Sequence, residues 1–279
     1  MRIWIVGKFG MVAHALVQAL QSRNAIFCST SRSEVDICNI DSVRNWYQIF
    51  RPTHTINAAA YTAVDRAEED VDRAYSINVE GAENIARVIA EEKGRFLHIS
   101  TDYIFSGENK DGYIEEDIPM PKNIYGKTKY EAEKKIQIYV PNCTILRTSW
   151  VISSNHTNFF TAMRQLMMER EEISIVSDQI GKPTLVGDLA EAALFLLEQE
   201  GIFHFANKGE TTWFGLAKEI HYCLQSVTKV RCTRIIPISS NDYPSKASRP
   251  AYSVLNTQKI ENYGLYIRHW KQGLGELLC

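Results

Sequence analysis

The sequence predicts an α/β protein in which a doubly wound parallel sheet is joined to a smaller C-terminal part. Three observations predict it. The chain has 279 residues, of which 45% are hydrophobic and 23% charged, which is ordinary globular composition with enough apolar side chains for a sizeable core. Short apolar runs alternate with amphipathic stretches up to about residue 150, and a glycine-containing turn follows the first run. Such alternation favours parallel strands joined by right-handed helical crossovers.

The elements of the sheet follow in order along the first half. Apolar runs predict strands, and apolar residues at helical spacing predict helices. Asp41 is a candidate N-cap for one of these helices, and Pro52 lies beyond its end. The predicted strands are 2–6, 25–28, 53–58, 95–100 and 143–148, and the predicted helices are 11–21, 41–50, 71–92 and 124–139.

The pattern loosens after residue 150. Helices are expected at 158–170, 188–199 and 212–227, with one more strand at 201–206. Residues 237–250 hold three of the eight prolines and are expected to form a loop.

Charge and cysteine usage exclude several classes of protein. Lys plus Arg is 31 and Asp plus Glu is 33, so the formal net charge of −2 gives no support for nucleic acid or an anionic membrane as the partner. No apolar run approaches 18 residues, and the N-terminus has no signal-peptide pattern. The six cysteines form no CxxC pair and the histidines show no metal-ligand spacing, so we expect a cytoplasmic protein without a metal site.

A candidate phosphate-binding turn directly follows the first strand. It has the spacing G-x-x-G-x-x-A, formed by Gly7, Gly10 and Ala13, and it opens the first predicted helix. Glycine lets the backbone approach a pyrophosphate closely, and the helix N-terminus supplies free N–H groups. An ordinary strand-to-helix turn is the alternative, but the strand–turn–helix context favours a dinucleotide site of the Rossmann type.

The end of the second strand favours NADPH over NADH. A carboxylate there would bind the ribose 2′-hydroxyl of NADH, but the chain continues with Ser31 and Arg32, and no carboxylate comes before Glu34. Hydroxyls and a guanidinium suit a 2′-phosphate, although Arg32 is alternatively a solvated loop residue and NADH remains a tolerated cofactor. Asp36 and Ile37 follow, where they can close over the adenine ring.

A tyrosine and a lysine at i and i+4 begin the predicted helix 124–139. Tyr125 and Lys129 share one helix face, so the lysine charge is expected to lower the pKa of the phenol and Lys129 is free to bind the nicotinamide ribose. By spacing alone such a pair is usually a surface pair. The pair indicates a catalytic site only in combination with the glycine turn upstream.

A hydroxyl that binds a substrate carbonyl is expected at the end of the strand 95–100. Ser100 and Thr101 lie there, at the edge where open α/β sheets bind ligands, although both could merely cap a turn. His98, inside this strand, is expected to be a core residue or a support for the site rather than a catalyst.

These residues together resemble the extended short-chain dehydrogenase/reductase superfamily, and further motifs resemble its dTDP-4-dehydrorhamnose reductase family. The resemblance runs from Arg2 to about Glu276. Its motifs are residues 57–68, 100–105, 123–129, 147–150 and 178–184, with 211–213 and 247–250 later in the chain.

The resemblance implies a role for each matched residue. Tyr125 would be the proton donor, Lys129 its partner and a cofactor ligand, and Thr101 the donor to the substrate carbonyl. Asp102 and Trp150 would contact the sugar nucleotide and Arg249 its diphosphate, although Trp150 could be core and Arg249 a surface charge. The cofactor would be lined by Gly7, Phe9, Gly10, Met11, Val12, Asp36, Ile37, Ala58, Ala59, Ala60, Tyr61 and Thr62.

The resemblance also implies an activity and an organisation. The reaction would reduce the 4-keto group of dTDP-4-dehydro-β-L-rhamnose with NADPH. Residues 1–152 would form an NADP-binding Rossmann domain whose sheet is completed by about 185–207, and 153–279 would supply the sugar-nucleotide-binding domain. Some members form dimers bridged by magnesium, but Ala15 and Gly187 occupy two positions of those ligands, so a monomer or a dimer without a metal bridge is expected.

Two alternative activities are disfavoured and two further alternatives stay open. Related dehydratases carry Asp-Glu after the active threonine, whereas Asp102-Tyr103 stands here, and epimerases hold NAD, which Arg32 disfavours. Another nucleotide-sugar 4-ketoreductase remains open, since one pocket residue can change sugar preference. So does a regulatory NADP-binding subunit resembling that of methionine adenosyltransferase, which the complete Thr101, Tyr125 and Lys129 set disfavours.

Overall fold

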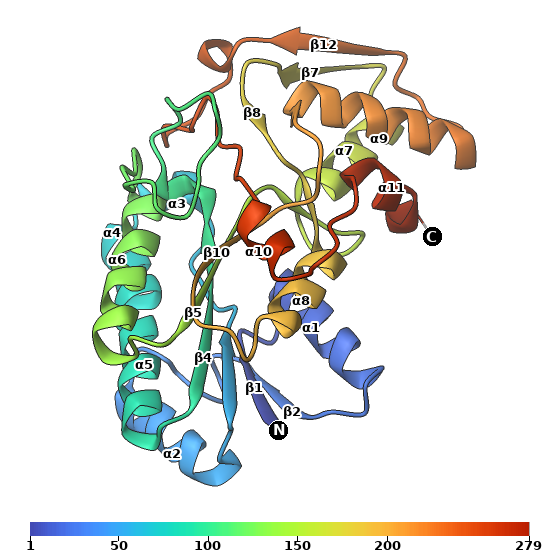
Figure 1. Cartoon of the computed structure of the whole chain (residues 1–279). Coiled ribbons are helices and arrows are strands. Elements are labelled where there is room, and N and C mark those ends of the chain that lie inside the picture. The colour runs from blue at the N-terminus through green and yellow to red at the C-terminus, as the bar shows by residue number, and fades with distance from the viewer. Residues whose placement is uncertain (279) are drawn as a thin grey trace.

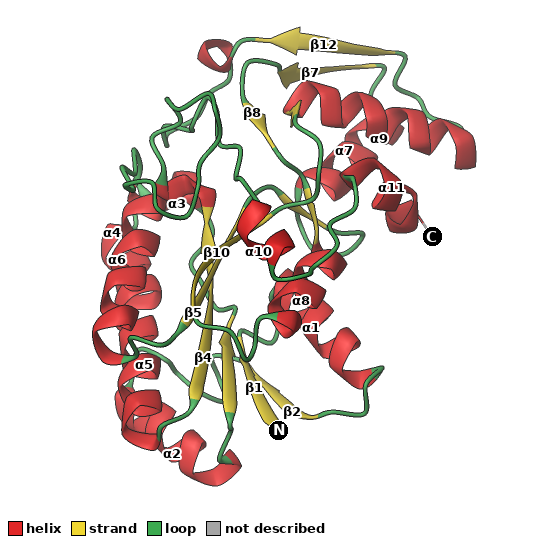
Figure 2. Cartoon of the chain, in the orientation of Figure 1, coloured by secondary structure: helices red, strands yellow, loops and turns green. Residues whose placement is uncertain are grey.

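A six-stranded parallel sheet forms the centre of the molecule. The computed structural model describes residues 1–278. Every neighbouring pair in this sheet is parallel, and the order β2-β1-β3-β4-β5-β10 confirms the predicted doubly wound arrangement (Figures 1 and 2). The strands are β1 (Arg2–Val6), β2 (Ile26–Thr30), β3 (His54–Asn57), β4 (Arg95–Thr101), β5 (Thr144–Thr148) and β10 (Gly201–Phe205).

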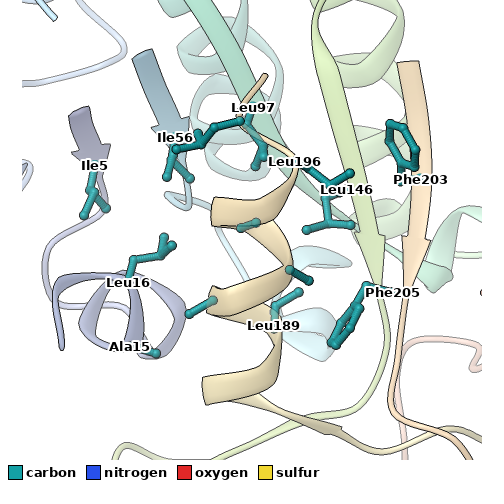
Figure 3. Close-up of a cluster of buried hydrophobic side chains, with 14 of the residues drawn as sticks. Ile5, Ala15, Leu16, Ile56, Leu97, Leu146, Leu189, Leu196, Phe203 and Phe205 are labelled. Atoms are coloured by element: carbon teal, nitrogen blue, oxygen red, sulfur yellow. The ribbon is translucent and has the colours of Figure 1, made fainter. Parts of the chain in front are cut away.

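Helices cover both faces of this sheet. Figure 1 shows α1 and α8 on one side and α2, α5 and α6 on the other. Apolar side chains that alternate along the strands, including Ile5, Leu146 and Phe203, pack with Leu16 of α1 in the core beneath α1 and α8 (Figure 3). The helices are α1 (Met11–Gln21), α2 (Ile40–Phe50), α5 (Gly81–Glu92), α6 (Ile124–Tyr139) and α8 (Val186–Phe195).

The predicted helix 71–92 is not one uninterrupted α-helix. It consists of α4 (Val71–Tyr75), a π-helical segment (Ser76–Glu80) and α5, and the short α3 (Val64–Ala67) precedes it. The wider π turn carries the buried Asn78, whose side chain binds the backbone of Tyr61 and the hydroxyl of Thr128. A π segment is a usual device for directing one side chain toward a site, here toward the loop after β3.

A second apolar cluster lies beyond the carboxyl ends of the strands. The helices at 159–169 and 213–227 were predicted, but the helix at 270–274 and the parallel strand pair were not, and the start of the predicted loop 237–250 belongs to that pair (Figure 2). Pro237 is tolerated because this sheet has only two strands, so its missing N–H can face away from the partner. The elements are α7 (Phe159–Glu169), β7 (Glu172–Val176), α9 (Trp213–Val227), β12 (Arg234–Ile238), a 3₁₀ turn (Ser240–Asp242) and α11 (Trp270–Leu274).

Short elements connect the two parts of the molecule. The pairs β6–β9 and β8–β11 each contain two residues per strand. Within residues 1–278, no helix combines the length and the apolar character that a membrane span requires. The remaining short elements are β6 (Val151–Ile152), β8 (Ile180–Gly181), β9 (Thr184–Leu185), β11 (Thr211–Thr212), α10 (Gln258–Asn262), and 3₁₀ turns at Asp102–Ile104 and Gly275–Leu278.

The strand order determines where a ligand can enter. The chain passes from β1 to β2 on one side and then returns to β3 on the other side of β1. Connections therefore leave the carboxyl ends of β1 and β3 in opposite directions and open a crevice there. The candidate site lies at this edge.

Candidate functional site

The backbone at the ends of β1 and β3 forms a narrow cleft. Gly7 has φ +105°, and a Cβ on it would stand 2.9 Å from the amide nitrogen of Ala59. Its own N–H and that of Lys8 donate to the carbonyl of Thr30 at the end of β2, at 3.0 and 2.9 Å. Only glycine gives this turn both its conformation and its closeness to the neighbouring strand.

Helix α1 presents an uncapped N-terminus to this cleft. Its N-cap residue is Gly10, which offers no side-chain acceptor to the first turn, and no acidic residue lies in that turn. The helix-end N–H groups and their partial positive charge are therefore available to an anion. The glycine turn and this helix end together fit the pyrophosphate of a dinucleotide.

A cavity of about 260 Å³ continues from the turn along the ends of β2 and β3. It collects ten of the residues predicted to bind the cofactor. Met11, Val12, Tyr61 and Thr62 lie outside this lining, at the start of α1 and beyond the end of β3. The ten are Gly7, Phe9, Gly10, Ser31, Arg32, Asp36, Ile37, Ala58, Ala59 and Ala60.

A carboxylate that the strand pattern does not place there lies beside the polar end of the cleft, bonded to Ser31. Glu34 folds back and accepts hydrogen bonds from the amide and the hydroxyl of Ser31, at 2.8 and 2.7 Å, and from Lys8 at 3.1 Å. These bonds, led by the Ser31 amide, lower the pKa of Glu34 to about 2. Arg32 is 65% exposed and comes no closer than 3.9 Å to Asp36, so its charge is free to meet a phosphate.

Two hydroxyls meet at the carboxyl end of β4. Thr101 is the last residue of β4, and its hydroxyl is hydrogen-bonded to that of Tyr125 in the first turn of α6. Gly126 makes the approach possible, because a Cβ on it would lie 2.1 Å from the carbonyl oxygen of Tyr103. Asn123 caps α6 by accepting from the Gly126 amide at 2.7 Å. The predicted catalytic pair is thus brought together by two features of the helix start.

The electrostatics of this pair differ from the sequence-based expectation. Burial raises the pKa of Tyr125 above its ordinary value, and the hydrogen bond between Tyr125 and Thr101 only partly offsets this. The Lys129 amine lies 2.9 Å from His98 and donates to the Ile99 carbonyl at 2.7 Å. The expected lowering of the phenol pKa by Lys129 is therefore not what the structure shows. At neutral pH Tyr125 is a protonated phenol.

Asp102 lies directly beside this pair and is buried. It is 2% exposed, and Thr101 donates to its Oδ1 at 3.1 Å. Burial raises the pKa of Asp102 to about 6, against hydrogen bonds from Ser253 and Thr101 that lower it. A carboxylate without a cationic partner beside two hydroxyls is a strong acceptor for a further polar group.

A cavity of about 780 Å³ lies between α7, β7, α9 and residues 240–249, and we call it the aromatic pocket. Trp213 lines it and stacks on Trp150 with ring centroids 3.5 Å apart. Trp150 has φ +45°, a strained conformation for a bulky residue, and its ring lies against Gly181, where a Cβ would approach to 2.5 Å. Gln179 accepts from the Trp213 indole at 3.1 Å. Trp150 supports the pocket from behind, and Trp213 and Gln179, which were given no role, face into it.

Arg249 reaches the aromatic pocket from the proline-containing loop. Its guanidinium donates to Asp65 at 2.7 Å and is also hydrogen-bonded to Tyr103. Asp65 in addition accepts from the amide of Ala247 at 3.0 Å. This pairing joins segments 184 residues apart, so Asp65 was not predicted. Across residues 1–278, no group of three or more His, Cys, Asp or Glu side chains could hold a metal ion.

Comparisons with known proteins give one consistent family. The model of the RmlD substrate binding domain matches residues 1–279. The spore coat polysaccharide biosynthesis protein SpsK of Bacillus subtilis is 36% identical, covering 99% of this chain and 96% of that protein. The dTDP-4-dehydrorhamnose reductase of Aggregatibacter actinomycetemcomitans is 35% identical over 98% of this chain and 97% of its own.

A solved structure agrees over the whole fold. The crystal structure of dTDP-4-dehydrorhamnose reductase from Bacillus anthracis in complex with NADP has a TM-score of 0.94 and 35% sequence identity. The match covers 99% of this chain and 98% of that one.

Proposed function

The chain belongs to the family of the RmlD substrate binding domain, and from this premise we propose that it is a dTDP-4-dehydrorhamnose reductase. It reduces the 4-keto group of dTDP-4-dehydro-β-L-rhamnose to give dTDP-L-rhamnose. A hydride is added to C4 and a proton to the keto oxygen, and NADPH supplies the hydride when bound. The single observation that carries the proposal is the hydroxyl pair of Thr101 and Tyr125 beside the dinucleotide cleft.

The hydroxyl pair holds the keto oxygen and gives it the proton. Both groups lie at the end of β4, so an oxygen held by them also faces the crevice at the switch point of the sheet. Their hydrogen bonds strengthen as negative charge develops on that oxygen, which lowers the barrier rather than only binding the ketone. Because burial raises the pKa of Tyr125, the phenol carries its proton at neutral pH, as an acid must.

Other residues hold the two ligands. The turn at Gly7 and the N-terminus of α1 would hold the pyrophosphate, and the Lys129 amine would reach the nicotinamide ribose. The aromatic pocket would receive the nucleotide of the substrate, with Trp213 offering a face for stacking. Arg249, on the rim of the same pocket, would meet the diphosphate, while Asp102 would accept from a sugar hydroxyl.

Other residues support the proposal for assembly and compartment. Ala15 and Gly187 both line a single cavity of about 220 Å³, and neither side chain can bind a metal, so we infer a monomer or a dimer without a magnesium bridge. Five cysteines within residues 1–278 are free thiols, which suits the reducing cytoplasm.

The test is a coupled assay on the purified full-length chain. dTDP-glucose is converted by purified dehydratase and epimerase to the 4-keto-L sugar, and NADPH consumption is followed by absorbance. Consumption should require both upstream enzymes, and Tyr125→Phe should lower kcat by about 100-fold or more because the proton donor is lost.

A matched control keeps the interpretation specific. Tyr139→Phe removes a hydroxyl from the other end of α6, where it donates only to Glu83. It should leave kcat unchanged within about twofold. NADPH binding without consumption in the wild-type chain would contradict the reductase and favour a regulatory subunit.

A further inference from the structure

A chain of buried hydrogen bonds runs from Lys129 to the cofactor cleft. The Lys129 amine lies 2.9 Å from Nε2 of His98, and Nδ1 of His98 lies 3.2 Å from Nδ2 of Asn57. Oδ1 of Asn57 accepts from the backbone amide of Ala59 at 3.1 Å. Asn57, His98 and Lys129 are each no more than 2% exposed, so water cannot substitute for a lost partner. Ala59 lines the cleft against Gly7.

The cleft end of this chain determines where each proton lies. A backbone N–H can only donate, so Asn57 must turn its oxygen to Ala59 and its NH₂ group to His98. Nδ1 of His98 must then be an acceptor. A neutral imidazole has one N–H, which is therefore on Nε2. Burial and the neighbouring lysine hold the pKa of His98 well below its usual value, so the ring is neutral.

The position of the His98 proton then determines the protonation state of Lys129, at the other end of this series of hydrogen bonds. Nε2–H of His98 points at the Lys129 nitrogen, which can accept only as a neutral amine, while its own N–H donates to the Ile99 carbonyl. Burial lowers the pKa of Lys129 to about 8. Glu133, one turn further along α6, opposes this, but its carboxylate is paired with Arg147 at 2.8 Å.

We propose that His98, oriented by Asn57, is a positioning residue that couples the protonation of Lys129 to the Ala59 amide in the cofactor cleft. When Lys129 gains a proton, His98 Nε2 must become the acceptor. The ring proton then exchanges from Nε2 to Nδ1, and the Asn57 amide turns so that its oxygen faces His98. The net change is one proton gained at Lys129, and the Ala59 N–H is released toward the cleft. The coupling rests on the proposed function only for the part that Lys129 plays in turnover.

The direct test reads the tautomer of His98 in the full-length, cofactor-free protein. Long-range proton–nitrogen correlation of histidine-labelled chain shows which ring nitrogen carries the proton, with His98 assigned by the spectrum of His98→Gln. We expect Nε2–H at about pH 9 and Nδ1–H at about pH 6, with a midpoint equal to that of the Lys129 ε-carbon shift. The Ala59 amide shift should move with the same midpoint. A ring proton on Nδ1 at the higher pH, or a tautomer that stays constant while Lys129 titrates, would overturn the proposal.

A variant should move this midpoint in a known direction. Asn57→Asp offers carboxylate oxygens to both Ala59 N–H and His98 Nδ1–H, so Nε2 accepts from an ammonium, and the pKa of Lys129 should rise by about one unit or more. The pH profile of kcat should shift equally. The control is His54→Gln, at the opposite end of β3. The His54 ring is hydrogen-bonded to Thr53 and Glu198 and to none of the residues that link Lys129 to Ala59. An unchanged midpoint in Asn57→Asp would count against the coupling.

A second variant keeps the test decisive if the buried carboxylate prevents folding. His98→Leu removes the link, so Lys129 should still titrate while the Ala59 amide shift no longer follows it; a shift that still follows would overturn the coupling. None of these spectra needs the keto sugar. A tautomer change in a chain that consumes no NADPH would contradict the proposed function alone, and turnover without the change would contradict this inference alone.

Discussion

The cofactor cleft and the aromatic pocket differ in whether backbone or side-chain atoms form their walls. The cleft is made by backbone: Gly7 lies against Ala59 so closely that a Cβ would stand 2.9 Å from a main-chain nitrogen. The pocket is made by side chains from distant segments, with Trp213 stacked on Trp150 and Arg249 paired with Asp65. Main chain that directly follows the strands of a sheet cannot easily move aside, whereas a side chain can. Adding atoms should therefore be most harmful in the cleft, and changes in the pocket should be partly absorbed.

The largest effect is expected from Gly7→Ala. The new Cβ meets backbone of Ala58 and Ala59 at 2.9–3.1 Å, and φ +105° is strained for alanine. The clash is relieved only if the backbone that faces the pyrophosphate moves, so NADPH affinity should fall by roughly 1000-fold, or about 4 kcal/mol, which isothermal titration calorimetry would measure.

The matched control is Gly187→Ala at the start of α8, where a Cβ meets nothing within 4 Å. It should leave NADPH affinity unchanged and stabilise the helix by up to about 1 kcal/mol. Equal affinities for the two variants would contradict a backbone-built cleft.

The next effect concerns Asp102, beside the catalytic hydroxyls. Its folded-state pKa of about 6 lies above the usual 3.8, so this carboxyl stabilises the fold below about pH 4 and that contribution is lost as the pH rises through 6. Asp102→Asn removes the buried charge. Its free energy of unfolding should therefore gain on the wild type between pH 4 and 6, reaching at most about 3 kcal/mol. Urea unfolding across this range measures the difference.

The opposite sign is expected for Asp178, which is exposed at the edge of the aromatic pocket. Partial burial raises the pKa of its carboxyl, but hydrogen bonds from Ser240 and Ser239 together outweigh burial and hold the pKa below its ordinary value. Asp178→Asn should lose stability relative to the wild type as the pH rises above the acidic range. A parallel pH trend in the two variants would contradict the different environments assigned to them.

The same difference between backbone and side-chain walls explains how much of the site could be predicted from the sequence. The cleft follows from local order: a strand, a glycine turn and a helix bring Gly7 to the edge where parallel strand ends meet, and Thr101 follows by the same rule. The pairing of Arg249 with Asp65 has no local signal, since it joins two loops 184 residues apart. The environment of Lys129 was also not predicted, because helical spacing shows which face of the helix a residue occupies but not which side chains of other elements it contacts.

Gly181→Ala should show that the pocket absorbs change better than the cleft. The new Cβ would stand 2.5 Å from the ring of Trp150, and that ring must shift on Trp213. We expect KM for the nucleotide sugar to rise about tenfold, with kcat and NADPH affinity nearly unchanged, by steady-state kinetics. Adding Trp150→Phe makes room and should restore part of the loss, as a double-mutant cycle would measure. A variant that loses NADPH affinity instead would show that the two regions are not separate.

The smallest effect is expected at the end of the cleft that would meet the 2′-phosphate, where side chains rather than backbone form the wall. Arg32 is 65% exposed and pairs only loosely with Asp36, at 3.9 Å, whereas the negatively charged carboxylate of Glu34 accepts a hydrogen bond from the adjacent Ser31. Exposed charges are screened, so Arg32→Gln should lower the preference for NADPH over NADH by only about threefold, and less at high salt. Glu34→Gln should raise the preference by a similar factor, because it removes a charge that repels phosphate. The ratio of kcat/KM with NADPH to kcat/KM with NADH, measured for each variant at two salt concentrations, tests both expectations. A change in the same direction for both variants would mean that the arrangement of the loop, and not its charge, selects the cofactor.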